Sequence, residues 1–197
     1  MYCVSIVSVK GGVGKSTACA NLAAAAHTAN PAARTLLIDT DIQQSTVKWA
    51  EQRRQLIPRV ISADARTLSR EVDNARGAFD ICFIDGAGHD WKGLAAAVLA
   101  ADLALVVARP TLIDYHVARQ VRSILSDYRV GFAFLLTQAP PGNRLTQWLA
   151  EYRKLGNVAP VVSARVAFQD SFGFGKGVTE YEPHGSAARE INCRSWL

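Results

Sequence analysis

The chain has 197 residues, of which 49% are apolar and 20% charged, and these proportions are typical of one soluble globular domain. The formal net charge of +5 permits an acidic partner such as DNA but does not require one. No apolar run approaches the length of a membrane-spanning helix, and the first strand begins almost at Met1. We therefore expect no signal peptide and place the protein in the cytoplasm. Four scattered cysteines without a CxxC pair argue against a zinc site or a disulfide framework.

Short apolar runs of strand length alternate with longer runs of helical spacing along the chain. Strands are predicted at 4–9, 35–39, 58–62, 78–85, 103–107, 131–137 and 158–162. Helices are predicted at 16–27, 46–55, 67–75, 91–100, 113–128, 145–155 and from 186 onward, with the glycine-rich stretch 173–177 as a connecting loop. This order predicts a single α/β domain over 1–197, in which a mainly parallel, twisted sheet of about seven strands has helices on both faces. Ligands of such sheets bind beyond the carboxyl ends of the strands.

A glycine-rich segment separates the first predicted strand from the first predicted helix. It consists of Lys10, Gly11, Gly12, Val13, Gly14, Lys15, Ser16 and Thr17. A strand, a glycine loop and a helix in this order form the context of a phosphate-binding P-loop, where backbone N–H groups and the helix N-terminus attract an anion. We expect Lys15 to reach the β- and γ-phosphates and the Ser16 hydroxyl to ligate Mg²⁺. The alternative is an ordinary glycine turn, and Lys10 has no role in either interpretation.

Carboxylates end two more of the predicted strands. Asp85 follows four apolar strand residues and suits the Walker B position, where it would bind Mg²⁺ through a water, although aspartates often end strands. Asp39 and Asp41 follow the second strand, and we hypothesise that Asp41 positions the attacking water while Asp39 supports the Mg²⁺ shell. The alternative is that one of them caps the next helix. Gly86 and Gly88 give the segment after Asp85 the freedom of a switch.

The loop with two lysines resembles the deviant Walker A loop of the ParA/MinD family of P-loop ATPases. Segments 37–43, 79–85, 110–114 and 177–191 also resemble the family, most of all the small plasmid-type ParA partition proteins, so the similarity covers nearly the whole chain. One departure is Ile42, which stands where the family's DxDPQ run has proline.

The resemblance implies a Mg²⁺-dependent ATPase of weak intrinsic activity. It implies a homodimer that forms on ATP, in which Lys10 crosses to the phosphates bound by the partner subunit. ATP-bound dimers are expected to bind DNA without sequence preference, and a ParB-like or other cargo-bound activator is expected to stimulate hydrolysis. The cycle would partition plasmids or chromosomes, or position another cargo along the nucleoid.

Further contacts are expected at the end of the sixth predicted strand and near the C-terminus. The adenine pocket would include Thr137 or Gln138 and the loop near Pro183, and Thr137 stands where the family commonly has asparagine. The DNA-binding candidates are basic side chains for which an ordinary solvated face is the alternative: Arg165, Lys176, Arg189 and Arg194.

Two other classes of protein are alternatives to a DNA-partitioning ATPase. A MinD-like, membrane-associated regulator of cell division is the main alternative, but the tail from Glu190 onward lacks a basic amphipathic helix, so no stable membrane anchor is expected. The second is a metabolic or redox relative that shares the loop, such as a nitrogenase iron-protein homologue or a small-molecule ligase. An iron–sulfur cluster would need two suitable cysteines per subunit beyond the Walker B strand, where the sequence has only Cys193, and a ligase would need a second substrate pocket, which the sequence does not identify.

Overall fold

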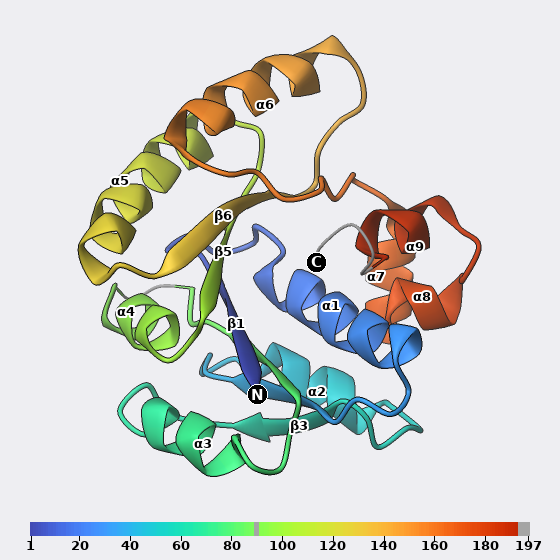
Figure 1. Cartoon of the computed structure of the whole chain (residues 1–197). Helices are drawn as coiled ribbons and strands as arrows, with labels where there is room; N and C mark the ends of the chain where they lie inside the picture. The colour runs from blue at the N-terminus through green and yellow to red at the C-terminus, as the bar shows by residue number, and fades with distance from the viewer. Residues whose placement is uncertain (89–90, 193–197) are drawn as a thin grey trace.

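Six parallel strands form the central sheet in the computed structural model, which describes residues 1–88 and 91–192 (Figure 1). The strands are Tyr2–Val7 (β1), Thr35–Asp39 (β2), Arg59–Ser62 (β3), Ile81–Asp85 (β4), Leu103–Ala108 (β5) and Gly131–Leu136 (β6). Their order across the sheet is β3-β2-β4-β1-β5-β6, and every pairing is parallel. The carboxyl ends of all six strands therefore lie at one edge, as the sequence predicts.

Helices cover both faces of the sheet (Figure 1). One face carries Leu68–Ala75 (α3), Trp91–Leu99 (α4), Leu112–Tyr128 (α5) and Asn143–Leu155 (α6). The other carries Lys15–Ala29 (α1), Ser45–Glu51 (α2), Val166–Gly173 (α7), Val178–Tyr181 (α8) and Ser186–Ile191 (α9). The predicted fold class, an α/β sandwich around a parallel sheet, is confirmed.

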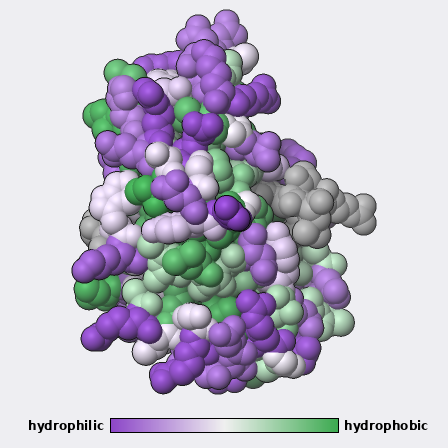
Figure 2. Space-filling model, turned by 60° about the vertical axis from the view of Figure 1, so that its left-hand side comes forward, coloured by the Kyte–Doolittle hydropathy of each residue, from purple (hydrophilic) through white to green (hydrophobic). Residues whose placement is uncertain are grey.

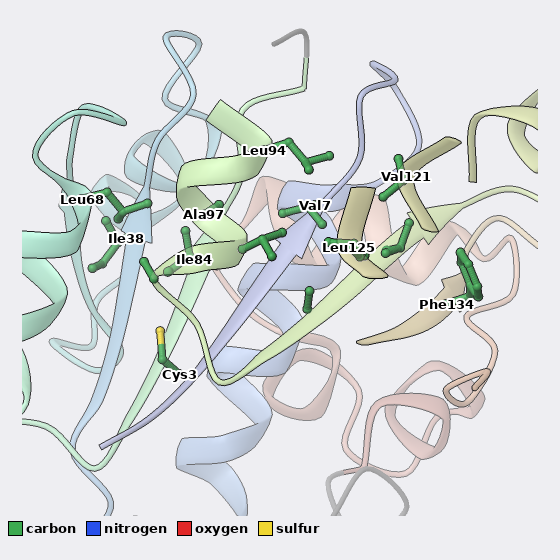
Figure 3. Packing of buried hydrophobic residues seen from close by; sticks show 14 of the residues in the cluster. Cys3, Val7, Ile38, Leu68, Ile84, Leu94, Ala97, Val121, Leu125 and Phe134 are labelled. Carbon is green, nitrogen blue, oxygen red and sulfur yellow. The ribbon is translucent and has the colours of Figure 1, made fainter. Parts of the chain in front are cut away.

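The strands supply side chains to two cores because successive residues point to opposite faces. In β2, Leu36 and Ile38 join the core under α3–α6, whereas Leu37 joins the core under α1. Figure 3 shows the first of these cores, in which Ile38 lies beside Leu68 of α3 and Ile84 lies beside Ala97 of α4. Burial on both faces explains why these strands are continuous apolar runs.

The seventh predicted strand, 158–162, falls short of a strand. The segment runs beside β6 and the residues that follow β6. Two isolated parallel bridges join them there, Phe134–Val158 and Ala139–Ser163. Ala159 donates its N–H to the carbonyl of Phe134 at 2.9 Å, and Val162 donates to Leu136 at 2.8 Å. These two donors are three residues apart, with Pro160 between them, whereas a regular strand presents every second N–H to one neighbour, so a regular ladder does not form.

The helices after this segment are tied to α2 by buried polar contacts. Arg53, just beyond α2, forms an ion pair with Glu180 of α8 at 2.8 Å and lies 4.5 Å from the ring centre of Trp49. The indole N–H of Trp49 donates to the carbonyl of Lys176 at 3.2 Å. The expected loop 173–177 thus begins inside α7, which the sequence did not predict, and it packs against α2.

Figure 2 shows that hydrophilic side chains surround a smaller hydrophobic area on another face of the molecule.

Candidate functional site

The glycine loop after β1 turns through backbone conformations that favour glycine. Gly12 has φ +71° and Gly14 has φ +90°, and α1 begins at Lys15 directly after Gly14. Two side chains after β6 hold the loop: the hydroxyl of Thr137 donates to the carbonyl of Val13 at 2.5 Å, and the amide of Gln138 donates to Gly12 at 2.9 Å. The N-terminus of α1 is thereby presented at the carboxyl edge of the sheet, where it favours an anion.

Lys15 places a nearly buried ammonium group in this loop. Its side chain belongs to a residue only 7% exposed, and Nζ donates to the carbonyl of Lys10 at 3.2 Å. Burial lowers the pKa of Lys15, while the nearby charges of Asp85 and Asp41 act in the opposite direction. Gly88 leaves the space this side chain needs, since a Cβ there would lie 2.5 Å from Nζ. An ammonium held in this way suits a phosphate ligand.

Asp39 has both carboxylate oxygens engaged by the chain. One oxygen accepts from the Thr46 N–H at 2.9 Å, its hydroxyl at 2.7 Å and the Val47 N–H at 3.2 Å, and the other accepts from the Asp41 N–H at 3.0 Å. The residue is fully buried and satisfies the first turn of α2, which is the alternative role considered from the sequence. Support of a Mg²⁺ shell by Asp39 stays a prediction.

Asp85 lies beside Asp39 in the parallel register and is equally buried, but neither of its oxygens has a hydrogen-bond partner among the described residues. Burial is the main cause that raises its pKa to about 7, and the negative charge of Asp39 adds to the effect. Lys15 and the Ser16 hydroxyl favour the charged form, although Ser16 does not reach hydrogen-bond geometry. A buried carboxylate of this kind lacks a cation or a donor.

These residues fit Mg²⁺. Within residues 1–88 and 91–192 no group of three or more His, Cys, Asp and Glu side chains could hold a metal ion. Mg²⁺ in phosphate sites usually takes only one or two carboxylates and completes its shell with water and phosphate oxygens. Asp85 and Ser16 would hold the ion here.

Asp41 connects the loops that follow β2 and β4. Its Oδ1 accepts from the Gln43 N–H at 2.9 Å and its Oδ2 from the Gly88 N–H at 3.4 Å. The carboxylate is half-buried and its charge is felt at Lys15. This is the region where an attacking water would lie, and the water-positioning role stays a prediction.

Lys10 forms an ion pair with Asp114 in the first turn of α5, a partner that sequence reasoning did not identify. Asp114 is 2% exposed and also accepts from the backbone N–H of Arg109 at 3.0 Å and from its Nε at 2.9 Å. Burial opposes ionisation, but the hydrogen bonds from Arg109 and Lys10 hold the pKa of Asp114 at about 2. One sequence signal could have identified Asp114 as a site residue. It is a carboxylate three residues after Thr111, which follows β5 and caps the next helix.

A cavity of about 480 Å³ opens beside the P-loop and the end of β6. Gly14, Thr17, Thr137 and Gln138 line one side, and segment 162–169 lines another. The cavity has the position and size for a nucleoside next to the loop. Pro183, expected near the adenine, is not among the lining residues.

The basic residues suggested for DNA binding differ in their surroundings. Arg165 is paired with Glu190 at 2.7 Å and lines the cavity, which leaves its charge largely compensated. Arg189 is exposed but donates to the carbonyl of His184 and the hydroxyl of Ser186. Lys176 is exposed, and Arg194 lies outside the described residues.

Comparison with known families shows to which group of proteins the glycine loop and its surroundings belong. Residues 4–178 match the model of the CobQ/CobB/MinD/ParA nucleotide-binding domain. The chain belongs to this family. The resemblance to the ParA/MinD group is thereby confirmed.

Individual relatives support the assignment. Maintenance of carboxysome distribution protein A from Gloeobacter kilaueensis is 31% identical over 144 residues, which make up 70% of this chain and 63% of that relative. The match thus spans under two thirds of the relative's length. The septum site-determining protein MinD from Pyrococcus horikoshii, solved with Mg-ADP, superposes with a TM-score of 0.76 at 20% identity over 97% of this chain and 93% of that one. An ATP complex of a McdA variant from Cyanothece has a TM-score of 0.76 at 15% identity, covering 100% and 96%.

The family match shows a nucleotide-binding domain, and the expected cofactors ATP and Mg²⁺ agree with the Mg-ADP and the ATP bound in these two solved structures. None of the helices in the described part of the chain has the length and hydrophobicity that a membrane-spanning helix needs.

Proposed function

We propose that this protein hydrolyses Mg-ATP and uses the cycle to position a cargo along DNA. The observation that carries the proposal is the pair formed by Lys15 and Asp85. One is a buried ammonium in a glycine loop and the other is a buried carboxylate without a hydrogen-bond partner among the described residues, and both lie at the carboxyl edge, where parallel α/β sheets bind ligands. A Mg-nucleotide supplies what each of them lacks.

The residues around this pair divide the work of phosphoryl transfer. Lys15 and the loop amides neutralise the charge of the β- and γ-phosphates, and Asp41 orients the attacking water. Mg²⁺, held by Ser16 and Asp85, would neutralise charge that develops between the β- and γ-phosphates. Thr137 and Gln138 hold the loop in its binding conformation through Val13 and Gly12. Weak intrinsic hydrolysis follows if the water is fully positioned only when an activator docks.

A second copy of the chain completes the site in this proposal. Lys10 lies at the start of the glycine loop with its side chain 29% exposed, and bulky apolar side chains stand exposed in the loop after β2 and in the first turn of α5 at the same edge. Ile42, after β2, is 95% exposed, and Leu112 and Ile113, after β5, are 61% and 67% exposed. Exposed apolar residues around a polar site favour an interface. The ATP-bound dimer places Lys10 on the phosphates of the partner subunit.

The proposal also names a class of cargo and the DNA along which this cargo is positioned. The relative that maintains carboxysome distribution favours a large cargo other than a plasmid. Plasmid or chromosome partition uses the same cycle and stays within the proposal. The net charge of +5 suits DNA without sequence preference. An activator on the cargo would then release the protein from the nucleoid.

DNA binding in ATP, in ADP and without nucleotide tests this function, with wild type beside Lys10→Ala. Wild type is expected to retain duplex DNA only with ATP, and Lys10→Ala is expected to lose retention. If about six phosphates are contacted, log K should fall with log salt with a slope of about −5. DNA binding that does not depend on ATP or on salt concentration would contradict the proposal. ATP-dependent sedimentation of the protein with anionic vesicles would favour the MinD-like alternative.

A further inference from the structure

Lys10 is already occupied within its own subunit. Its ammonium group pairs with Asp114, and its side chain is 29% exposed while that of Asp114 is 2% exposed. The carbonyl of Lys10 also accepts from Lys15 Nζ at 3.2 Å. A Lys10 that reaches the phosphates of another subunit therefore has to leave Asp114 first, because the buried carboxylate cannot follow it.

Asp114 is held in place independently of Lys10. Its Oδ2 accepts from the backbone and the side chain of Arg109, and its own N–H donates to Thr111 Oγ1 at 3.3 Å. These contacts tie it to the loop between β5 and α5. When Lys10 departs, Arg109 still neutralises the carboxylate, so no uncompensated charge is left in the interior. The cost of breaking a buried pair arises mainly when one partner is stranded, and here it is not.

We propose that Asp114 is a positioning residue that holds Lys10 against its own subunit until the triphosphate of a second copy competes for the ammonium group. The inference rests on the proposed ATP-dependent dimer and adds what restrains it. Asp114 and Arg109 set the ATP concentration at which dimers form. Arg109 weakens the hold on Lys10, because it shares the same carboxylate.

Substitutions of Asp114 and of Arg109 should shift the ATP concentration needed for dimerisation in opposite directions. Asp114→Asn removes the charge that retains Lys10, so dimers should form at an ATP concentration about tenfold lower than in wild type. Arg109→Gln leaves Lys10 as the main cation on Asp114, so dimers should need more ATP than in wild type. A merely structural role of the ion pairs would shift both variants in the same direction, together with a loss of thermal stability.

The experiment is a sedimentation titration of the full chain with a non-hydrolysable ATP analogue and Mg²⁺. The variants are Asp114→Asn, Arg109→Gln, Lys10→Ala and Lys10→Ala/Asp114→Asn, and the matched control is Asp73→Asn, whose exposed pair with Arg76 lies on α3. The gain from Asp114→Asn should vanish without Lys10, and Asp73→Asn should behave as wild type.

The outcomes separate the two proposals. A wild type that stays monomeric with the analogue would overturn the proposed function and this inference together. A wild type that dimerises while Asp114→Asn needs as much analogue or more would overturn this inference alone. Should Asp114→Asn fail to fold, the Arg109→Gln titration decides, since an unchanged or lower analogue requirement contradicts the hold on Lys10.

Discussion

Asp39 and Asp85 are register partners on adjacent parallel strands, yet their carboxylates have opposite surroundings. The Asp39 carboxylate accepts four hydrogen bonds from the chain, whereas that of Asp85 accepts none from the residues that the structure describes. The difference arises because α2 begins over Asp39 and brings its free N–H groups to that carboxylate, while glycines follow Asp85. The Asp39 carboxylate therefore stabilises the start of α2, and the Asp85 carboxylate is the candidate for a ligand.

The pH dependence of stability should report the isolation of Asp85. Its pKa of about 7 in the folded state lies above the ordinary aspartate value of 3.8, so between these two pH values the folded state keeps a proton that the unfolded state releases. Stability contributed by this group consequently falls as pH rises from about 4 to 7, and the full penalty above pH 7 is on the order of 4 kcal/mol. Asp85→Asn removes the penalty.

Urea unfolding without nucleotide and with a chelator measures this effect. At about pH 8, Asp85→Asn should be more stable than wild type, and the gain should shrink toward pH 4. Asp73→Asn, an exposed change of the same kind, should change stability little at either pH. A loss of stability in Asp85→Asn at high pH would show that the carboxylate has a partner in solution.

Asp41→Ala should separate binding from turnover. The carboxylate accepts from the N–H groups of Gln43 and Gly88, which lie outside the glycine loop that would cradle phosphates. ATP affinity should therefore stay within about twofold while phosphate release is lost. Phosphate release and binding of a fluorescent nucleotide measure the two effects. Asp64→Ala, at an exposed pair with Arg66, is the control. Retained hydrolysis in Asp41→Ala would exclude the water-positioning role.

Gly88→Ala should impair nucleotide binding without unfolding the protein. The added Cβ would lie 2.5 Å from Lys15 Nζ, and the flexible end of the lysine can move away at little cost to stability. The displaced ammonium should lower ATP affinity by about tenfold. Gly77→Ala meets no atom within 4 Å and serves as control. Equal calorimetric affinities for both variants would mean that Lys15 is not confined by Gly88.

Arg53→Met should destabilise the C-terminal helices. The Arg53 and Glu180 side chains are 2% and 12% exposed, so the change strands a nearly buried carboxylate and also removes the cation from the face of Trp49. The expected cost is about 3–5 kcal/mol in urea unfolding. Arg66→Met, at a pair 89% and 53% exposed, should cost under about 1 kcal/mol. Similar costs for both changes would argue against a structural role for the buried pair.

The sequence predicted the parts of this structure that depend on short-range patterns. Continuous apolar runs such as 35–39 and 81–85 identify buried parallel strands, and the strand ends bring the P-loop, Asp39 and Asp85 to one edge. Contacts between distant residues left no such pattern. The pairing of Lys10 with Asp114 and the clamp of Arg53 on Glu180 join residues more than a hundred positions apart. Pro160 was visible, but its effect on the ladder beside β6 depends on which N–H groups face that strand.

The mass of the protein in solution with Mg-ATP and with Mg-ADP tests the central claim, that the loop with Lys10 and Lys15 couples nucleotide state to assembly. Sedimentation of wild type should give a dimer with ATP and a monomer with ADP, and Lys10→Ala should stay monomeric with both while still binding ATP. A wild-type mass that is the same in ATP and in ADP, with nucleotide bound in each case, would contradict the account.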